Sequence, residues 1–504
     1  MKKIFFTGIL AAATLSLLIS CGGDNTKISD VNDAESNGGG GEIAAADKTG
    51  EAAEERLYPD LEARDFGGYE FTFLTRTITN ENWTDWDHRD IFAEEANGDV
   101  INDAVYGRNR KIESKYNINI KEITVEQGVF TSNITKSVRA EDDVYDAVCI
   151  HLIGELATLA SDGSLTDLFK MPHIGLDMPW WNQNCVRDLS IGHKLFVIQG
   201  DLLILDNDAL EAMIFNKTLI KDYGLESPYD IVKRGEWTFD KLLEMSKGIA
   251  RDLNGDGAMY FADDLFGATV QADTAASFLV SGGEKIAGKD ENDYPALTFG
   301  SEKCYRILEI VSEINMNSNE YVNTHRHNSQ HKVHDILTNM MSENRVLFSW
   351  IRMRVAEAMR AIETDFGIIP CPKSDKSQEK YITRNNPHTS AGVSIPVTAS
   401  DPERTGMILE DLCAESKYTL QPAYYEINLR GKFVRDDDSQ EMLDIILSNT
   451  AYDIGAIYDF GGFLDTLLHY GRDQKTDYAS AFERVKGRME SDIEKIIAAF
   501  GNLG

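Results

Sequence analysis

The segment from Asp252 to Asp263 has the spacing of a calcium-binding loop. Its oxygen donors stand at loop positions one, three, five, seven and twelve: Asp252, Asn254, Asp256, Ala258 through its carbonyl, and Asp263. Gly257 occupies the sixth position, where such a loop turns sharply. This spacing predicts a structural calcium ion without a catalytic role. The alternative is an acidic turn in which the same side chains bond to nearby backbone amides.

Tryptophan is the second residue type whose placement suggests chemistry. Trp83 follows the first expected strand in a loop, Trp180 and Trp181 are adjacent, and Trp350 lies in the segment Leu347–Arg352. Flat apolar rings suit the C–H faces of sugars, so tryptophans in polar loops indicate sugar binding. Packing in a core or at its rim is the alternative for each of them.

Signatures of catalysis are scarce in the chain. There is no Gly-x-Ser-x-Gly elbow and no His-Glu-x-x-His motif, and Gly283–Asp290 misses a phosphate loop because Asp290 replaces its Ser or Thr. Four histidines fall between positions 325 and 334: His325, His327, His331 and His334. On a helix, the last three would share a face and could bind a transition metal, whereas a solvated polar loop is the alternative.

Periodicity predicts an α/β protein. Alternating strand patterns at Tyr69–Thr75 and Asn117–Thr124 flank a helical pattern at Val100–Tyr116. A further strand at Tyr145–Ile150 precedes a helix that starts near Glu155. This alternation argues for parallel α/β layers. Later strands are expected at Lys194–Val197, Ala212–Phe215 and Phe366–Ile369, and helices at Thr238–Arg251, Ser301–Asn315, Val355–Glu363, Asp401–Glu415 and Asp477–Phe500.

Length and charge narrow the classes of function. With 504 residues, of which 42% are hydrophobic, the chain can form two to four domains and a large core without disulfides or metals. Its 83 acidic residues against 50 Lys and Arg give a net charge of −33. Such a surface repels nucleic acid and anionic lipid headgroups, so nucleic-acid binding is excluded.

The N-terminus reads as an export signal. Lys2 and Lys3 precede a mostly apolar stretch from Ile4 to Ile19, which is too short for a bilayer span. It ends in Leu18-Ile19-Ser20-Cys21, which resembles a bacterial lipobox, so residues 1–20 are expected to be a lipoprotein signal peptide and Cys21 the lipidated residue. An ordinary secretory signal is the alternative. Residues 21–62 are acidic and glycine-containing and predict a flexible tether.

Several landmarks in the body occur in an order that resembles the extracellular solute-binding proteins of bacterial ABC importers. The similarity is to the carbohydrate-binding group that includes the maltodextrin-binding proteins. The matching segments cover most of residues 65 to 500: Asp162–Leu168, Ile191–Ile198, Met213–Lys217, Trp237–Leu242, Phe366–Pro370 and Val393–Pro396. The tether, the calcium-like loop and the additional length depart from the family pattern and leave the identity of the sugar open.

The resemblance implies a periplasmic-binding-protein-like type II fold, with two discontinuous α/β lobes, a hinge and a ligand cleft between the lobes. Residues 63–206 with 371–431 would form the first lobe, and residues 207–370 with 432–504 the second. The chain would cross between the lobes near Asp206, Pro370 and Gly431.

The resemblance also implies a set of ligand-binding residues. Trp350 stands where relatives place a sugar-stacking aromatic ring, and carboxylates and amides at the first crossing can bond to sugar hydroxyls. The whole expected set is Trp350, Asp206, Asn207, Asp208, Trp83, Arg76, His151, Tyr458, Phe460 and Arg352. Arg76, Trp83 and His151 follow strand ends of the first lobe, where open α/β sheets present ligands.

The function implied is that of a non-enzymatic binding subunit. It would capture a mono- or oligosaccharide, need no cofactor apart from the predicted calcium ion, and dock as a monomer on membrane permease subunits. The lipid on Cys21 would anchor it to the outer face of the cytoplasmic membrane. A surface glycoside hydrolase or polysaccharide lyase is one alternative, and a sugar-sensing co-receptor is another.

Overall fold

A computed structural model describes residues 56–77, 87–328, 332–359, 362–425 and 437–503. The expectations for the signal peptide, Cys21, Trp83 and the crossing near Gly431 lie outside these residues, as does most of the tether. Within the described ranges, no helix is both long enough and apolar enough to cross a membrane.

The first sheet has four strands in the order β12-β3-β1-β2. β1 (Tyr69–Thr77) pairs in parallel with both β2 (Ile118–Glu126) and β3 (Ala147–His151), and β12 (Ala391–Ser394) is antiparallel to β3. A helix follows β1 and another follows β2, as parallel pairing requires. These are α1 (Val100–Tyr116) and α2 (Gln127–Ala140).

The second sheet has five strands in the order β10-β4-β9-β5-β8. Their bounds are Phe366–Pro370 for β10, Glu211–Asn216 for β4, Val346–Arg352 for β9, Phe266–Val270 for β5 and Tyr321–Asn323 for β8. β5 is parallel to β8 and β9, whereas β4 is antiparallel to both of its neighbours. Every residue of these five strands is buried, so helices and loops cover both faces of the sheet.

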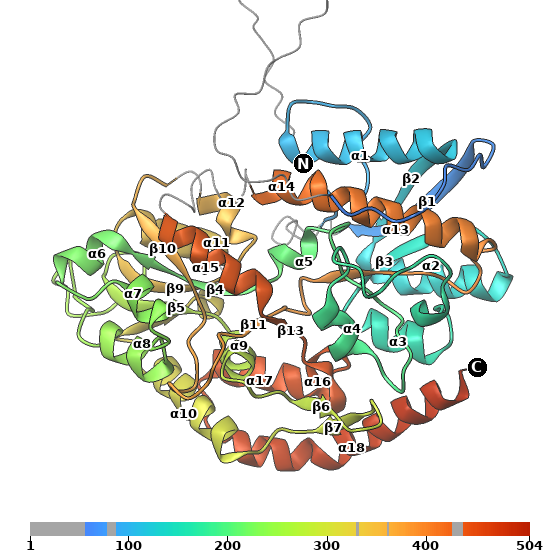
Figure 1. Cartoon of the computed structure of the whole chain (residues 1–504). Helices are drawn as coiled ribbons and strands as arrows, with labels where there is room; N and C mark the ends of the chain where they lie inside the picture. Colours follow the sequence, from blue (N-terminus) through green and yellow to red (C-terminus); the bar gives the residue numbers. More distant parts are fainter. Residues whose placement is uncertain (1–55, 78–86, 329–331, 360–361, 426–436, 504) are drawn as a thin grey trace, which may run out of the picture. The chain divides into compact units, whose positions relative to one another are not determined.

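Helices surround both sheets (Figure 1). Besides α1 and α2, the helices before β8 are α3 (Glu155–Ser161), η2 (Leu168–Lys170), α4 (Gln183–Leu189), α5 (Leu205–Asp208), α6 (Lys217–Asp222), α7 (Pro228–Lys233), α8 (Phe239–Ser246), α9 (Thr274–Ser281) and α10 (Glu302–Met316). Those after β8 are η3 (Thr324–His327), α11 (Val333–Ser342), α12 (Val355–Met359), α13 (Pro402–Tyr418), α14 (Leu420–Tyr424), α15 (Asp437–Ser448), α16 (Ile454–Ile457), η5 (Phe460–Gly462), α17 (Phe463–Asp473) and α18 (Tyr478–Asn502).

The chain passes from one sheet to the other at two described places. α5 lies between β3 of the first sheet and β4 of the second, and residues 371–390 lie between β10 of the second and β12 of the first. A short strand in the latter segment, β11 (Thr383–Arg384), pairs with β13 (Thr450–Ala451). A separate hairpin pairs β6 (Ala287–Lys289) with β7 (Pro295–Leu297).

The expectation of an α/β protein is confirmed, and α1 has the bounds that its pattern predicts. Asp99 caps its first turn by accepting from the Asn102 amide, and Asn117 ends it in the left-handed conformation. The strand expected at Lys194–Val197 is wrong. His193 forms a tight turn, and the run makes only isolated bridges, at Lys194 and at Ile198. Its apolar side chains are buried, so the pattern reflected burial and not sheet pairing.

The helix expected over Thr238–Arg251 is shorter than its pattern suggests. Thr238 caps α8 by accepting from the Lys241 amide, but the helix ends at Ser246. Gly248 then adopts a positive φ of 72°, which breaks the helical path and turns the chain toward the loop that begins at Arg251.

Candidate functional site

Polar residues gather where the parallel strands of the second sheet end. Gln271 and Asp273 follow β5, His325 follows β8 within η3, and Arg352 is the last residue of β9. Because these three strands are parallel, their carboxyl ends meet at one edge of the sheet, which is where open α/β sheets bind ligands.

This edge borders a pocket of about 240 Å³, here called the edge pocket. It is lined by Ala272, Asp273, His325, Asn328, Arg352, His388, Asp465, Leu468, His469 and Arg472. His388 comes from the segment that connects the two sheets, and the last four residues come from α17. Five separate parts of the sequence therefore supply the chemistry of this site.

Asp273 is held in its charged form inside the edge pocket. Its Oδ1 accepts from Asn386 Nδ2 at 3.1 Å. Burial on its own raises the pKa of an aspartate, but neighbouring basic side chains outweigh this and hold the pKa of Asp273 below its ordinary value. These groups are His388, His325, Arg384 and Arg352.

The two imidazoles that face Asp273 are held neutral near pH 7. Burial, together with nearby arginines, lowers the pKa of His325 and of His388, and the attraction to Asp273 only partly offsets it. The Ala272 amide donates to His325 Nδ1 at 2.9 Å. Since Nδ1 accepts, the neutral ring carries its proton on Nε2. His325 therefore presents an N–H donor from that nitrogen.

Several buried polar atoms at this edge have no hydrogen-bond partner among the described residues. Both amide atoms of Gln271 belong to this group, although the residue is only 1% exposed, as do Arg352 Nε and His388 Nε2. A buried polar group without a partner costs free energy unless water or a ligand satisfies it. The edge pocket is thus prepared to receive a polar molecule.

Two expected site residues lie at the matching edge of the first sheet. Arg76 is near the end of β1 and His151 is the last residue of β3. Arg76 is 1% exposed, and all three of its guanidinium nitrogens lack a partner in the described part of the chain. Burial lowers the pKa of Arg76 to about 10, so it is charged at neutral pH.

His151 connects this arginine to the edge pocket. Burial first, and then the positive charge of Arg76, lower the pKa of His151 well below its ordinary value. A backbone hydrogen bond with His388 acts in the opposite direction. Since His388 also lines the edge pocket, this bond places the end of β3 beside a segment that contributes to that pocket.

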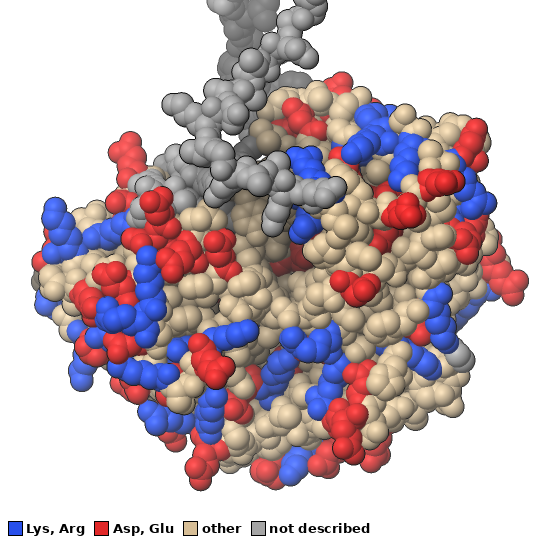
Figure 2. Space-filling model, in the orientation of Figure 1, with Lys and Arg blue, Asp and Glu red and all other residues tan. Residues whose placement is uncertain are grey.

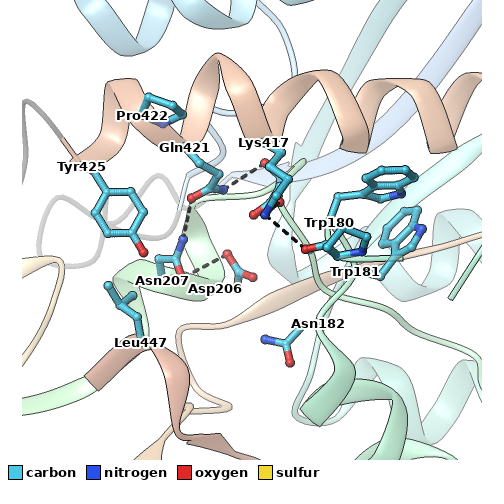
Figure 3. Close-up of a pocket in the computed structure, with 13 residues that line it drawn as sticks. Trp180, Trp181, Asn182, Asp206, Asn207, Lys417, Gln421, Pro422, Tyr425 and Leu447 are labelled. Atoms are coloured by element: carbon cyan, nitrogen blue, oxygen red, sulfur yellow. Dashed lines mark hydrogen bonds and ion pairs between the residues drawn. The ribbon is translucent and has the colours of Figure 1, made fainter. Parts of the chain in front are cut away.

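A second pocket, of about 390 Å³, lies beside α5 and is here called the α5 pocket (Figure 3). It brings together Asp206 and Asn207, as expected from the sequence, with Trp180, Trp181 and Tyr425. Figure 3 shows Asn207 bonded to Gln421, whose side chain extends from α14. The remaining lining residues are Pro179, Asn182, Gly200, Asp201, Lys417, Gln421, Pro422 and Leu447.

The polar groups of the α5 pocket largely satisfy one another. Asn207 Nδ2 donates to Gln421 Oε1 at 3.0 Å, and Lys417 forms an ion pair with Asp201 at 3.6 Å. Both indole nitrogens of the tryptophan pair donate to Glu410, and both rings are buried. Fewer groups are therefore left for a ligand here than at the edge pocket.

Six of the expected site residues that the structure describes line neither pocket: Arg76 and His151, discussed above, and four others. Trp350 is 0% exposed, and its Nε1 donates to Ser277 Oγ at 2.8 Å, so its ring packs in the core. Asp208 is engaged by Arg89, Arg354 and Tyr424. Tyr458 and Phe460 stack on each other in the core with ring centroids 5.9 Å apart, and Tyr458 contacts Phe500 of α18.

The loop predicted to bind calcium folds as a series of tight turns. Asp252 accepts from the amides of Gly255 and Gly257, and Asp256 accepts from Ala258. The buried carboxylate that closes the loop belongs to Asp264, which accepts from Leu253 and Tyr260, and not to Asp263. Within the described ranges, no group of three or more His, Cys, Asp or Glu is arranged to hold a metal ion. These bonds match the acidic-turn alternative, and calcium binding stays a prediction.

Sequence reasoning missed Gln271, Asp273, His388 and Asp465. The short strand β5, which positions the first two, is buried along its whole length and has no alternating pattern. His325 was visible only as one member of a histidine-rich segment. The position of η3 after β8 brings it to the pocket, whereas His327 and His334 do not line it and His331 lies outside the described residues.

Comparisons with known proteins identify the fold. A scan against protein-family models and a search of curated protein sequences found no match. Among solved structures, the chain is similar to the GacH receptor of Streptomyces glaucescens, solved unliganded and with acarbose, with 11% identity, a TM-score of 0.52 and coverage of 85% of this chain and 98% of that one. It is also similar to a cyclo/maltodextrin-binding protein with maltotetraose, with 12% identity, a TM-score of 0.53 and coverage of 86% and 99%.

A third similar structure is an ABC substrate-binding protein of Listeria monocytogenes in complex with cycloalternan, with 11% identity, a TM-score of 0.51 and coverage of 86% and 99%. The three likenesses span nearly the whole of each neighbour at very low sequence identity. They show that this chain has the periplasmic-binding-protein-like type II fold, as the order of sequence landmarks predicts.

Proposed function

We propose that this protein is the non-enzymatic binding subunit of an ABC importer and that it captures a carbohydrate at the edge pocket. The observation that carries this proposal is the set of buried, unpartnered polar atoms at the carboxyl edge of the second sheet, on Gln271, Arg352 and His388. Sugar hydroxyls both donate and accept hydrogen bonds, so a sugar can satisfy amide, imidazole and guanidinium groups together. Neighbours with the same fold were solved with acarbose, maltotetraose and cycloalternan.

The proposed lobes follow the sequence boundaries: residues 63–206 with 371–431, and residues 207–370 with 432–504. The membership of β12 in the first sheet and of β10 in the second supports them. Ligand binding then shifts an open–closed equilibrium about α5 and residues 371–390, because the closed state alone lets both sheet edges contact the sugar. The loaded protein, a monomer anchored through Cys21 at the outer face of the cytoplasmic membrane, delivers its sugar to permease subunits.

One observation favours a glycoside hydrolase as the second candidate function. Asp201 and Asp206 line the same α5 pocket, and burial raises the pKa of Asp201 to about 6 and that of Asp206 well above its ordinary value. A carboxyl with a raised pKa suits a general acid, but hydrolysis also needs a partner carboxylate that stays ionised. Because both of these groups favour protonation, the α5 pocket fits binding better than hydrolysis.

Calorimetry and product analysis on the purified protein test the proposal. Titration with a panel of mono- and oligosaccharides should give saturable binding at micromolar or lower concentration, which corresponds to roughly −8 kcal/mol or stronger. Small-angle scattering should show a smaller radius of gyration for the loaded protein. New reducing ends after incubation would instead support the hydrolase, and no binding to any member of the panel would reject both.

Binding alone does not separate the importer from a sugar-sensing co-receptor. In a cell that carries the native transporter genes, loss of this protein should abolish uptake of the labelled sugar. Uptake that continues while the transcriptional response to the sugar is lost would support the sensor instead.

A further inference from the structure

We infer that the carbohydrate is an acidic one, and that Arg352 and Arg76 receive its carboxylate or sulfate groups. This inference rests on the proposed function and specifies its substrate class. Buried atoms at the two sheet edges that lack partners among the described residues point to this class of ligand.

The unsatisfied atoms are mostly hydrogen-bond donors. Arg76 contributes three guanidinium nitrogens, Arg352 contributes Nε, and Gln271 contributes its amide nitrogen; none of these has a partner among the described residues. The only obligate acceptor among the unpartnered atoms of these three residues is Gln271 Oε1. A ligand that satisfies this set must supply many acceptors, and a carboxylate or sulfate supplies several at one point.

The acidic side chains at the edge pocket already have partners. Asp273 Oδ1 accepts from Asn386, and Arg384, which itself pairs with Glu211, is among the neighbours that lower the pKa of Asp273. Asp465 Oδ2 lies 3.3 Å from His469 Nε2. The acceptor groups of a ligand can therefore bond to the arginine N–H donors, while Asp273 and Asp465 are in contact with other protein side chains.

Arg76 and Arg352 differ from buried arginines such as Arg384 in having no hydrogen-bonded carboxylate among the described residues, although Glu155 and Asp87 lie near enough to Arg76 to raise its pKa. A single nitrogen without a partner is not the difference, because Arg384 Nη2 also lacks one in the described part of the chain. Arg384, which is also buried, forms an ion pair with Glu211 at 2.7 Å. Arg108 donates to four or more groups, including the carbonyls of Asp90 and Ile91. Arg352, in contrast, has only a 3.4 Å contact between Nη2 and His334 in the described part of the chain. Guanidinium groups kept buried with free N–H donors match the two-pronged recognition of oxyanions.

The local chemistry also overcomes an unfavourable overall charge. The net charge of −33 repels anions at long range, and on the face in Figure 2 the acidic and basic residues are interspersed without a broad basic patch. Attraction of an acidic sugar must therefore come from the buried arginines themselves, at short range. Selectivity would then depend on single residues and can be removed by single substitutions.

The test is calorimetry with matched sugar pairs that differ only in the acidic group: glucuronate with glucose, oligogalacturonate with oligogalactose, and a sulfated galactan oligomer with its unsulfated form. We expect the acidic member of at least one pair to bind roughly tenfold to a hundredfold more tightly, as one or two charge-assisted hydrogen bonds provide. The uronate and sulfate arms identify which anion is preferred.

Variants then assign the effect to the arginines. Arg352→Gln and Arg76→Gln should each reduce the preference for the acidic member and change the affinity for its neutral partner little. Arg352→Lys keeps the charge without the planar fork and should keep only part of the preference. Arg306→Gln is the matched control, because Arg306 is an exposed arginine on α10 that pairs with Asp240. Thermal melting of every variant shows whether it is folded.

The outcomes separate this inference from the function on which it rests. Equal or tighter binding of the neutral member in every pair would overturn the acidic-sugar inference and leave a carbohydrate-binding protein. A preference that persists in both folded glutamine variants would overturn the assignment to these arginines. Absence of binding to all six sugars would reject the proposed function itself.

Discussion

The carboxylate of Asp208 lies 3.2 Å from Arg354 Nη1 and 3.0 Å from Arg89 Nη2, so one buried acid joins three parts of the chain. Arg89 precedes α1, Asp208 ends α5 at the passage between the sheets, and Arg354 follows β9. The hydroxyl of Tyr424 donates to the other carboxylate oxygen at 3.0 Å. Sequence reasoning made Asp208 a candidate acceptor for sugar hydroxyls, whereas here the protein itself occupies both oxygens.

Replacing Asp208 should therefore affect folding more than binding. Asp208→Asn removes the negative charge that Arg89 and Arg354 contact, and we expect a loss of about 1–3 kcal/mol in the free energy of unfolding. Glu244→Gln is the control, because Glu244 is 69% exposed and forms an ion pair with Lys241 on its own helix. Urea denaturation measures both. Unchanged stability combined with lost sugar binding would restore Asp208 as a ligand residue.

A variant of Trp350 distinguishes a role in core packing from a role in sugar binding. Its ring is fully buried and its indole N–H donates to Ser277, so Trp350→Ala should cost about 3–5 kcal/mol of folding stability. The stacking role predicted from the sequence would instead cost affinity, by about 1–3 kcal/mol. Melting and calorimetry on the same variant decide between the two. A normal melting temperature with weakened binding would place Trp350 against the sugar.

The elements that the sequence predicts well are those whose local signals agree with their environment. α1 begins after the capping Asp99, ends at the left-handed Asn117, and carries its buried residues on one face, so pattern and capping give the same bounds. The Lys194–Val197 segment shows why such signals fail. Leu195, Phe196 and Val197 are apolar and buried, which suits a strand. The segment nevertheless joins no sheet, whereas the strand beside it, β12, pairs with β3.

The candidate site was predictable only in part, for a related reason. Arg76 and His151 could be proposed because they follow expected strands, and Arg352 because it shares the segment Leu347–Arg352 with Trp350, which the resemblance placed at the site. His388 and Asp465 come from segments far apart in the sequence and reach the edge pocket through the tertiary fold. No local pattern marks them, since their role depends on which strands share a sheet and on where the chain passes between the sheets.

Attachment to the membrane is tested at Cys21. Expressed in a bacterium that processes lipoproteins, the full chain should incorporate labelled fatty acid, because the lipobox cysteine is the acceptor. Cys21→Ser should abolish the label, while Cys413→Ser, which changes a buried cysteine of α13, should keep it. Equal labelling of the Cys21→Ser protein would contradict the lipoprotein prediction.

Thermal melting distinguishes the two interpretations of the Asp252–Asp263 loop, a calcium site and an acidic turn. A bound ion adds stability by mass action, about 2.7 kcal/mol at a hundredfold excess over Kd. Melting with calcium and with chelator measures this increment, and Asp252→Ala should remove it. In the acidic turn, Asp252→Ala removes the acceptor for Gly255 and Gly257 and lowers stability equally with and without calcium. A melting temperature that chelator does not change would reject the calcium prediction.

The α5 pocket makes a prediction about pH. Burial raises the pKa of Asp201 to about 6, which the ion pair with Lys417 only partly offsets. The folded state therefore holds this proton more tightly than the unfolded state, whose carboxyl titrates near 4. As pH rises from about 4 to 6, the unfolded protein loses this proton first, and the folded protein loses up to about 3 kcal/mol of stability relative to low pH.

Asp201→Asn cannot titrate, so the difference in unfolding free energy between wild type and variant should fall over this window and level off above it. Urea denaturation at intervals of half a pH unit measures this difference, in which the other titrating groups cancel. A difference that is constant from pH 4 to 7 would show that Asp201 has an ordinary pKa, and one that rises with pH would show that Lys417 dominates its environment.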